Sequence, residues 1–444
     1  MSLKNFFSMS APAAPLPEGQ VDRTYKRLRW QVLVAATIGY SLFYVCRLGW
    51  NIVKKALMDG GVLSVEEVGL IGGGLFVTYA IGKFTNGFLA DRSNIRRFMS
   101  VGLLVSGLIN LALGFTTAFA AFMVMWTVNG WAQSMGAAPS VVSLSRWFGD
   151  KERSTYYGIW SESHYIGSGL TYLIVPALVT AAGWQWGLRG VGLVGILGAL
   201  IVAVFLRDTP QSCGLPSIAE YQGDTETMKS QSGKSVGDLQ KQVLKNPAIW
   251  TLAIASAFMY ISRYAVESWG PTYLSGERGF SLESASLLML VFTFSGLLGT
   301  FISGFLADKF FKHSCRVPAF LSGVLNVMSL LLFFFGPSNT VFVVFSLFLV
   351  GTAIGALVCY LGGMMAVEIA PKKASGAALG TVGLASYLAT ALNEVVSGQI
   401  IHVEKLADGT TSYDFTLAIW VWVGAALLSA VVTALIKVVA ARQG

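Results

Sequence analysis

Twelve long apolar segments follow one another along this chain, and they constrain its fold more than any other feature. A helix that crosses a bilayer needs about 20 consecutive, mostly apolar residues, and each segment has roughly that length. Of the 444 residues, 54% are hydrophobic and 12% charged. Soluble domains carry roughly a quarter charged residues, so this composition excludes a water-soluble globule. The segments lie at about 31–56, 67–90, 98–118, 121–145, 155–181, 187–206, 249–274, 283–307, 317–335, 340–367, 375–402 and 415–438.

A single long polar stretch over 207–248 divides the apolar segments into two groups of six. The sequence therefore predicts an all-α membrane protein with a six-helix bundle over 31–206, a central cytoplasmic loop over 207–248 and a second six-helix bundle over 249–444. The polar, basic segment over 1–30 has no apolar run of its own, so we do not expect a cleaved signal peptide. We expect the first predicted helix to direct insertion of the chain into the membrane.

Positive charge alternates between the two sides of the predicted helices. Lysines and arginines gather in loops after even-numbered helices, whereas the loops after helices 3, 5 and 9 are nearly uncharged. Cytoplasmic loops carry the excess of Lys and Arg in membrane proteins. We therefore expect a multi-pass protein of a bacterial inner membrane with both termini in the cytoplasm. The basic loop residues are Arg92, Arg96, Arg97, Lys151, Arg153, Lys309, Lys312, Arg316, Lys372 and Lys373.

Composition also argues against several kinds of partner. The net charge of +8 does not indicate nucleic acid, because the basic residues are spread between apolar segments and form no single patch. Cys46, Cys213, Cys315 and Cys359 have no paired spacing, which supports neither a disulfide framework nor a zinc site. We expect no metal and no cofactor. The expected surroundings are the lipid bilayer, and the expected state is a monomer.

The two halves of the chain share short sequence repeats. Gly-Phe-Leu-Ala-Asp-Arg at 87–92 recurs as Gly-Phe-Leu-Ala-Asp-Lys at 304–309, and Tyr-Val-Cys-Arg at 44–47 recurs as Tyr-Ile-Ser-Arg at 260–263. Parallel halves with a binding site between them near the middle of the membrane are typical of secondary transporters. The repeats therefore predict two pseudo-symmetric bundles whose first helices carry an arginine at matching depth.

Arg47 and Arg263 are these two arginines, and they are the strongest candidates for a binding site. An arginine within an apolar span costs at least about 2.5–3.5 kcal/mol on insertion scales, so two at symmetric positions need a function. Guanidinium is planar, always charged and a bidentate donor, which suits a phosphate. The alternative is that each arginine pairs with a membrane carboxylate or extends to a helix end. Because the two arginines occupy matching positions in the two repeats, a role in binding is favoured over this alternative.

Other polar side chains inside the predicted helices extend this candidate site. We expect Lys83 and His164 to donate to a phosphate, the histidine in a proton-dependent way. The alternatives are a core histidine, and a lysine that is tethered to Glu162 or lies at a helix end. Five tyrosines rank lower, because aromatic residues in membrane helices more often serve packing. They are Tyr40, Tyr44, Tyr79, Tyr260 and Tyr387.

Three acidic residues, Glu162, Glu267 and Glu394, lie in or near predicted spans. Each can compensate the charge of a basic residue when the site is empty, and each can instead carry a proton. The sequence alone leaves both alternatives open. Nothing resembles a nucleophile with its base, so we expect no enzyme.

The repeated Asp-Arg and Asp-Lys loops point to a conformational role. Asp91 and Arg92 follow helix 2, and Asp308 and Lys309 follow helix 8. Glycine before each pair permits close helix packing, and the aspartate can meet a helix N-terminus or a basic side chain. We expect these four residues to form gating hinges.

At these residues the chain resembles the organophosphate:phosphate antiporter family of the major facilitator superfamily, which includes bacterial glycerol-3-phosphate and hexose-phosphate transporters and a hexose-phosphate sensor. The resemblance covers almost the whole chain and implies the twelve-helix major facilitator fold. It places Arg47 and Arg263 on the family's phosphate-binding arginines, His164 on a helix-5 histidine, Lys83 on a helix-2 lysine and Tyr387 on a helix-11 tyrosine. The motifs that carry it lie at 22–30, 91–94, 151–153, 207–216, 269–274 and 370–374.

Four positions depart from the family's pattern. Leu48 replaces a second basic residue, Val142 stands near a basic position of helix 4, Thr293 replaces a helix-8 glutamate, and Gly355 begins a sequence that replaces a Tyr-Gly-Pro turn. We expect Glu394 or Glu267 to compensate for the missing helix-8 carboxylate. These departures mean that glycerol-3-phosphate specificity does not carry over.

The expected function is therefore exchange of a phosphorylated organic anion, such as a sugar phosphate, for inorganic phosphate by alternating access. One alternative is a membrane sensor of a sugar phosphate that drives a two-component system. Another is a proton- or sodium-coupled carrier of a different organic anion, in which Glu162 or Glu394 titrates.

Overall fold

The computed structural model describes residues 3–223, 236–310, 315–370, 374–407 and 410–436. Within these ranges, eleven helices are long and apolar enough to cross a membrane. The predicted crossing over 121–145 consists of two shorter helices, α5 (Phe119–Ser134) and α6 (Ala137–Trp147). Together, these pieces account for the twelve predicted crossings.

The first half contains helices α1 to α9, and all of its predicted spans are helical. Helix α2 begins at Glu18, well before the predicted apolar span, and runs through 42 residues. The helices are α1 (Leu3–Phe7), α2 (Glu18–Asp59), α3 (Val65–Asp91), α4 (Ile95–Leu113), α5, α6, α7 (Asp150–Ser161), α8 (Ser163–Ala182) and α9 (Trp184–Phe205).

The predicted central loop contains a 3-10 turn (Gln211–Cys213) and the short helices α10 (Ile218–Gln222) and α12 (Val236–Lys245). The second half follows with helices α13 to α19, in which a π-helical turn separates α16 from α17. Its elements are α13 (Pro247–Gly276), α14 (Leu282–Phe310), α15 (Arg316–Phe335), α16 (Thr340–Cys359), the π turn (Tyr360–Met364), α17 (Met365–Ile369), α18 (Ser375–Ile400), β1 (His402–Lys405), β2 (Thr411–Asp414) and α19 (Thr416–Leu435).

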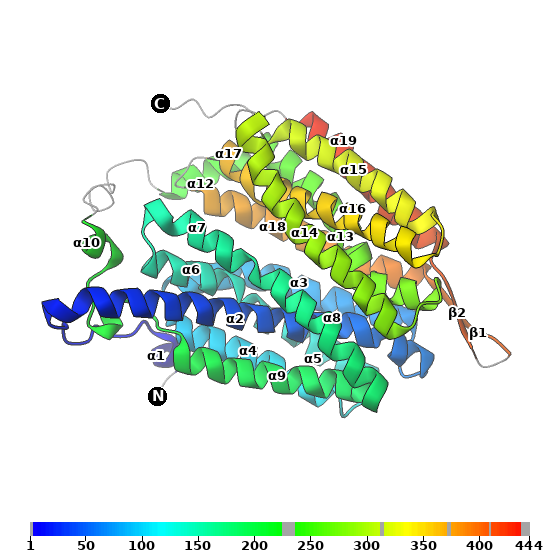
Figure 1. The fold of residues 1–444 in the computed structure, drawn as a ribbon, viewed down its shortest axis with the longest axis horizontal. Helices are drawn as coiled ribbons and strands as arrows, with labels where there is room; N and C mark the ends of the chain where they lie inside the picture. The colour runs from blue at the N-terminus through cyan, green and yellow to red at the C-terminus, as the bar shows by residue number, and fades with distance from the viewer. Residues whose placement is uncertain (1–2, 224–235, 311–314, 371–373, 408–409, 437–444) are drawn as a thin grey trace.

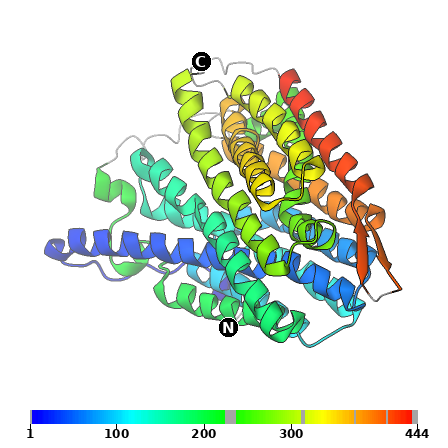
Figure 2. The ribbon, with the colours of Figure 1, turned by 45° about the vertical axis from the view of Figure 1, so that its right-hand side comes forward.

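The two halves lie side by side along their length. Figures 1 and 2 show α2 to α9 on one side and α13 to α19 on the other, with the β1–β2 hairpin at the end opposite the start of α2. The contact between the halves runs through α3 with α18, α8 with α14, and α2 with α13. A site between the halves is therefore built mainly from these six helices.

The α3–α18 contact is close at only one end. A Cβ atom added to Gly69 of α3 would lie 2.8 Å from Cα of Gly398 in α18, so the two backbones touch there. Toward the opposite ends of the same helices, a Cβ atom added to Gly87, Gly376 or Gly380 meets no atom within 4 Å. The halves are thus packed together where α2 ends and lose this backbone contact where α3 ends.

Asp208 organises the other end of the first half. Its carboxylate accepts hydrogen bonds from the Ile95 amide at the start of α4 (3.0 Å), from Arg146 of α6 (2.7 Å) and from the Ser10 amide (2.8 Å). A carboxylate at a helix N-terminus stabilises the helix through its dipole. Arg146 also donates to the Asp91 carbonyl (3.0 Å), so the loop after α3 is fixed by residues outside its own motif.

The predicted hinge residue Asp91 therefore differs from expectation. Asp91 and Arg92 are exposed, and within the described ranges the Asp91 carboxylate forms no ion pair. The expected contact of a carboxylate with a helix N-terminus and a basic side chain is made by Asp208 instead. Lys309 is exposed and lies 5.1 Å from the ring centroid of Phe305, and the side chain of Asp308 lies outside the described residues.

The hairpin between α18 and α19 was not predicted. The eleventh apolar segment was expected to extend to His402, but the helix ends at Ile400 and His402 begins β1, paired with Asp414 of β2. The hydroxyl of Tyr413 donates to the Asp59 carboxylate (2.5 Å). The hairpin of the second half is thereby tied to the end of α2 in the first half.

Candidate functional site

Arg47 lies on α2 in the interior between the halves and is 4% exposed. Its guanidinium carbon lies 4.2 Å from the ring centroid of Tyr44 and 5.3 Å from that of Tyr79. Nε and Nη2 of Arg47 are buried and have no hydrogen-bond partner among the described residues. Arg47 therefore neither pairs with a carboxylate in the described ranges nor extends to a helix end. Two buried donors without a partner are a strong attraction for an anion.

Arg263 lies at the equivalent place on α13 but has a different partner. It is 8% exposed, and its Nε donates to Oε2 of Glu267, one turn further along the helix, at 3.0 Å. Its guanidinium carbon lies 5.6 Å from the ring centroid of Tyr260 and 5.5 Å from that of Tyr264. The expectation that Glu267 compensates Arg263 agrees with this contact. The charge of Arg263 is locally matched, whereas that of Arg47 is not.

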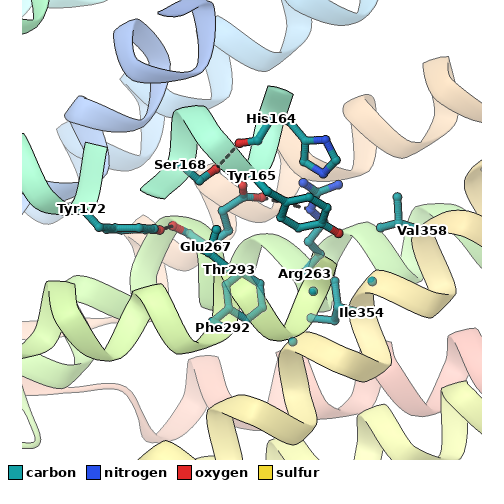
Figure 3. A pocket seen from close by; sticks show the side chains of 13 residues that line it. His164, Tyr165, Ser168, Tyr172, Arg263, Glu267, Phe292, Thr293, Ile354 and Val358 are labelled. Atoms are coloured by element: carbon teal, nitrogen blue, oxygen red, sulfur yellow. Dashed lines mark hydrogen bonds and ion pairs between the residues drawn. The ribbon is translucent and has the colours of Figure 1, made fainter. Parts of the chain in front are cut away.

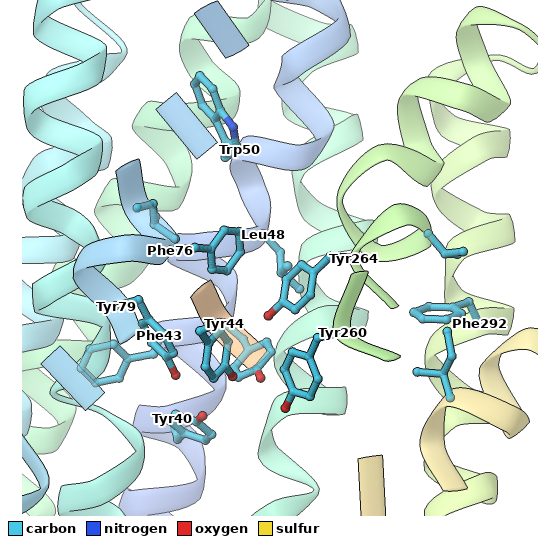
Figure 4. Packing of buried hydrophobic residues seen from close by; sticks show 14 of the residues in the cluster. Tyr40, Phe43, Tyr44, Leu48, Trp50, Phe76, Tyr79, Tyr260, Tyr264 and Phe292 are labelled. Carbon is cyan, nitrogen blue, oxygen red and sulfur yellow. The ribbon is translucent and has the colours of Figure 1, made fainter. Parts of the chain in front are cut away.

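Aromatic rings from both halves form a cluster at the interface (Figure 4), and each of the two arginines lies against rings of this cluster. The ring of Tyr387 on α18 lies 4.6 Å from the Tyr79 ring and 5.3 Å from the Tyr260 ring. On the first half, the Tyr40 ring lies 5.4 Å from the Tyr44 ring. All five tyrosines predicted from the sequence therefore lie in one cluster around Arg47 and Arg263.

Lys83 and His164 adjoin the same cluster. Nζ of Lys83 lies 4.8 Å from the ring centroid of Tyr387. The His164 ring lies 5.6 Å from the Tyr44 ring, and its Nδ1 is 2.5 Å from the Ser161 carbonyl oxygen. Helix α8 begins at Ser163, directly after Glu162, the residue that follows the end of α7, so His164 lies in the first turn of α8. The structure therefore brings the four predicted basic residues to one region.

A small cavity of about 20 Å³, room for about one water molecule, lies beside Arg263. It is enclosed by α8 of the first half and by α13, α14 and α16 of the second, and Figure 3 shows His164, Arg263 and Glu267 at its edge. Tyr165 donates or accepts a hydrogen bond with Thr300 across the halves at 3.0 Å. The residues that line the cavity are His164, Tyr165, Ser168, Tyr172, Arg263, Glu267, Phe292, Thr293, Gly296, Gly351, Ile354, Gly355 and Val358.

Two of the four positions that depart from the family's pattern lie on this cavity. Thr293 and Gly355 line it, while Leu48 is buried in the core and Val142 packs against the core. A Cβ atom on Gly355 would lie 2.0 Å from the Gly296 carbonyl oxygen, so α14 and α16 touch through their backbones there. The wall of the cavity is therefore fixed by this glycine contact.

Glu394 does not compensate Arg263, contrary to one of the two expectations. It is 1% exposed and accepts from Nζ of Lys54 at 3.0 Å, and Lys54 is fully buried. Lys54 also donates to Ser268 Oγ (2.6 Å) and lies 4.4 Å from the Trp269 ring centroid. This network joins α2, α13 and α18 at the end where the halves are packed together.

Lys54 is a site residue that sequence reasoning missed. It lies within the apolar segment over 31–56, where a lysine is as unusual as Lys83 is in the next helix. Its nearness to the end of the segment and to Lys55 concealed this signal. Its partner is 340 positions away in the sequence, so no local pattern indicates the pair.

Glu162 stands at the break between α7 and α8. Its Oε2 is buried and has no partner among the described residues. The suggested tether between Glu162 and Lys83 is not among the ion pairs of the described ranges, where Lys83 instead packs on Tyr387. Within the same ranges, no group of three His, Cys, Asp or Glu side chains could hold a metal ion.

Comparison with known proteins identifies the family. The family model of the Major Facilitator Superfamily matches residues 7–393. The chain belongs to this superfamily. Its members and the relatives below are membrane transporters and a sensor rather than enzymes, and the chain is a multi-pass membrane protein of this fold.

Curated relatives confirm the resemblance within the superfamily. The membrane sensor protein UhpC of Escherichia coli (strain K12) is 34% identical over 398 residues, which cover 86% of this chain and 89% of that protein. The glycerol-3-phosphate transporter of Bacillus subtilis (strain 168) is 32% identical and covers 86% of this chain and 88% of its own. The probable hexose phosphate transport protein of Chlamydia trachomatis serovar D is 30% identical, with 86% of each chain covered.

Solved structures show the same fold. A bacterial homolog of the human lysosomal transporter Spinster, in an inward-facing and unoccupied conformation, superposes with a TM-score of 0.70 at 17% identity, over 92% of this chain and 94% of that chain. The D-xylose-proton symporter gives a TM-score of 0.69 at 15% identity, over 91% and 97% of the two chains. At these identities the likeness shows the twelve-helix fold alone.

Proposed function

We propose that this chain transports a phosphorylated organic anion and exchanges it for inorganic phosphate by alternating access. The observation that carries the proposal is the state of Arg47, whose buried Nε and Nη2 have no partner among the described residues. A fully ionised phosphate monoester is acceptor-only and doubly negative, and a guanidinium group is its best bidentate partner. The relatives named for glycerol 3-phosphate and hexose phosphate support this class of cargo.

Arg47 and Arg263 belong to opposite halves, so an anion bound by both also holds the halves together. When the site is empty, Arg47 is a buried charge without a partner among the described residues, whereas Arg263 is paired with Glu267. Phosphate or a phosphate ester pairs with Arg47 and permits the halves to rock. Return of the empty carrier meets the larger barrier, which favours exchange over net leak.

The proposed direction of opening follows from the same helices. We place both termini in the cytoplasm, because the basic loops lie on that side. The packed end, with Lys54 and Glu394, then faces the periplasm. The end where Gly376 and Gly380 meet open space faces the cytoplasm, so this conformation is proposed to admit cytoplasmic anions.

Reconstitution into phosphate-loaded liposomes tests the proposal. We expect labelled phosphate to enter only when phosphate or a phosphate ester is present inside, and a panel of sugar phosphates, triose phosphates and carboxylates to compete according to the cargo. Entry that requires a proton gradient and ignores internal phosphate would contradict exchange. It would favour the alternative of a proton-coupled carrier, in which the unpartnered carboxylate of Glu162 titrates.

A sensor is the second candidate, because UhpC, a membrane sensor protein, matches 86% of this chain. A sensor binds its ligand without rapid exchange. Ligand-induced stabilisation of the purified protein, combined with no exchange in liposomes and a two-component gene pair beside this gene, would favour it over transport.

A further inference from the structure

Asn51 of α2 occupies the position in the first half that Glu267 of α13 occupies in the second. Each lies four residues after the buried arginine of its own half. Residues four apart lie on one face of a helix, where a carboxylate can pair with an arginine. Arg263 forms such a pair, because its Nε donates to Oε2 of Glu267 at 3.0 Å. Asn51 has an uncharged amide at the matching place, so Arg47 has no carboxylate one turn further along its helix.

The amide of Asn51 is used across the interface between the halves instead. Pro271 lies inside α13 and has no amide hydrogen, so the carbonyl of Glu267 lacks the helical hydrogen bond that it would accept from position 271. Nδ2 of Asn51 donates to this carbonyl at 3.1 Å, and the Tyr172 hydroxyl of α8 donates to it at 3.5 Å (Figure 3). Donors of the first half therefore satisfy a carbonyl that a proline leaves free in the second half.

A glutamate in place of Asn51 would meet one unpaired cation on its own helix. It has no N–H group to donate, so it cannot replace the bond to the Glu267 carbonyl. Lys54, three residues further along α2, is already bonded to Glu394 at 3.0 Å. Arg47, four residues earlier, has buried Nε and Nη2 atoms without a partner among the described residues. We therefore expect a carboxylate at this position to pair with Arg47.

We infer that Asn51 is a positioning residue for the anion site, because it leaves Arg47 without a counterion and ties α2 to the second half. The inference rests on the proposed function and adds a residue that determines the affinity of the same site. One unit of charge at this position decides whether Arg47 attracts an anion or is locally matched, as Arg263 is by Glu267. Asn51 thus acts on the anion through Arg47.

Asn51→Glu and Asn51→Gln form a matched pair of variants, because the two new side chains have the same length and differ in charge. Binding of inorganic phosphate is measured on the purified full-length protein by ligand-induced thermal stabilisation. We expect Asn51→Glu to bind phosphate about 30-fold more weakly than Asn51→Gln, which corresponds to about 2 kcal/mol and lies within the range of close charge pairs. The unfolding temperature without phosphate reports whether each variant folds.

Exchanging the two residues separates a charge effect from damage to packing. The double variant Asn51→Glu with Glu267→Asn keeps the net charge of the site and moves the carboxylate to the first half. We expect it to bind phosphate at least about tenfold more tightly than Asn51→Glu alone, because Arg263 then has no counterion. Damage to the packing of α2 on α13 would add up instead of being rescued.

The single variant Glu267→Asn makes the two positions identical and does not depend on the folding of Asn51→Glu. It should bind phosphate about tenfold more tightly than the wild-type protein, because asparagine at this position leaves the arginine unmatched. Weaker or unchanged binding in this variant would overturn the inference.

Equal phosphate binding by Asn51→Glu and Asn51→Gln would also overturn the inference, and so would a double variant that binds no better than Asn51→Glu. The proposed exchange would still stand in these cases. The expected differences in binding, together with no phosphate exchange by the wild-type protein in liposomes, would contradict the proposed transport function while supporting the inference. The two failures are therefore distinguishable.

Discussion

The two halves of this transporter bury the same residue at equivalent places and treat it differently. Arg47 of the first half lies against Tyr44 and Tyr79 with two donors unpartnered among the described residues, whereas Arg263 of the second half is bonded to Glu267 at 3.0 Å. A buried charge without a partner is costly, and a ligand that pairs with it recovers that cost. Pseudo-symmetry of the chain thus does not make the site symmetric, because Arg47 keeps buried donors without a partner among the described residues and the charge of Arg263 is already matched by Glu267.

The largest expected effect comes from replacing the guanidinium group of Arg47 or Arg263 with the ammonium group of lysine. Arg47→Lys keeps the charge but removes the bidentate fork, and we expect phosphate exchange in liposomes to fall at least about 100-fold, because loss of one partner of a buried, hydrogen-bonded charge pair costs about 2–5 kcal/mol. Arg263→Lys should lose less, about tenfold, because Glu267 already shares that charge. Arg23→Lys, on the exposed start of α2, is the control. Equal losses of exchange in the two site variants would contradict the claim that Arg47 and Arg263 differ in how far their charges are matched.

A second test uses the other buried cation of the first half, Lys54, which is paired across the interface with Glu394. Glu394→Gln leaves the ammonium group without its counterion, and we expect a loss of about 3–5 kcal/mol in the stability of this conformation. The double variant Lys54→Met with Glu394→Gln should recover much of that loss. Thermal unfolding of the wild-type protein, Glu394→Gln, Lys54→Met and the double variant in detergent measures both effects, and simple additivity of the two single variants would contradict a coupled pair.

Removing the carboxylate partner of Arg263 should leave this arginine, like Arg47, without a counterion. In Glu267→Gln the guanidinium group is no longer matched, so we expect inorganic phosphate to bind about tenfold more tightly while the empty protein becomes less stable. Equilibrium binding and unfolding without ligand report the two changes separately. Weaker phosphate binding would show that Glu267 positions Arg263 for the anion rather than competing with it.

The smallest expected effect concerns the contact between the hairpin of the second half and the end of α2 in the first half. Tyr413→Phe removes the hydrogen bond to Asp59, which we expect to contribute about 1 kcal/mol at this partly exposed position. A double-mutant cycle with Asp59→Ala, read from unfolding midpoints, isolates the coupling energy of this hydrogen bond. A coupling energy of zero would mean that the hairpin contacts α2 but that this hydrogen bond contributes no stability.

Hydropathy predicted the helical crossings because burial in a bilayer imposes a length and composition on each span. The break at Met135 and Gly136 and the hairpin after Ile400 were not visible, since both depend on packing rather than on apolar length. The start of α2 at Glu18 was also missed. Its polar first turns are held by the central segment, through Tyr221 and Asp22 (2.5 Å), which an apolar pattern cannot show.

The site could be predicted in part. Arg47 and Arg263 are visible as charges in apolar spans, and the spacing of Arg263 and Glu267 is that of an ion pair on one helix face. The partner of Glu394 could not be chosen, because Lys54 of α2 and Glu394 of α18 meet only when the two halves pack together.

The central claim is that the unpartnered donors of Arg47 hold the anion and that Arg263 faces it from the other half. A structure determined with tungstate, a heavy analogue of phosphate, tests this most directly through its anomalous signal. The account predicts an anion within hydrogen-bond distance of Nε and Nη2 of Arg47 and in contact with Arg263. An anion bound only elsewhere, with the Arg47 donors still unpartnered, would contradict it.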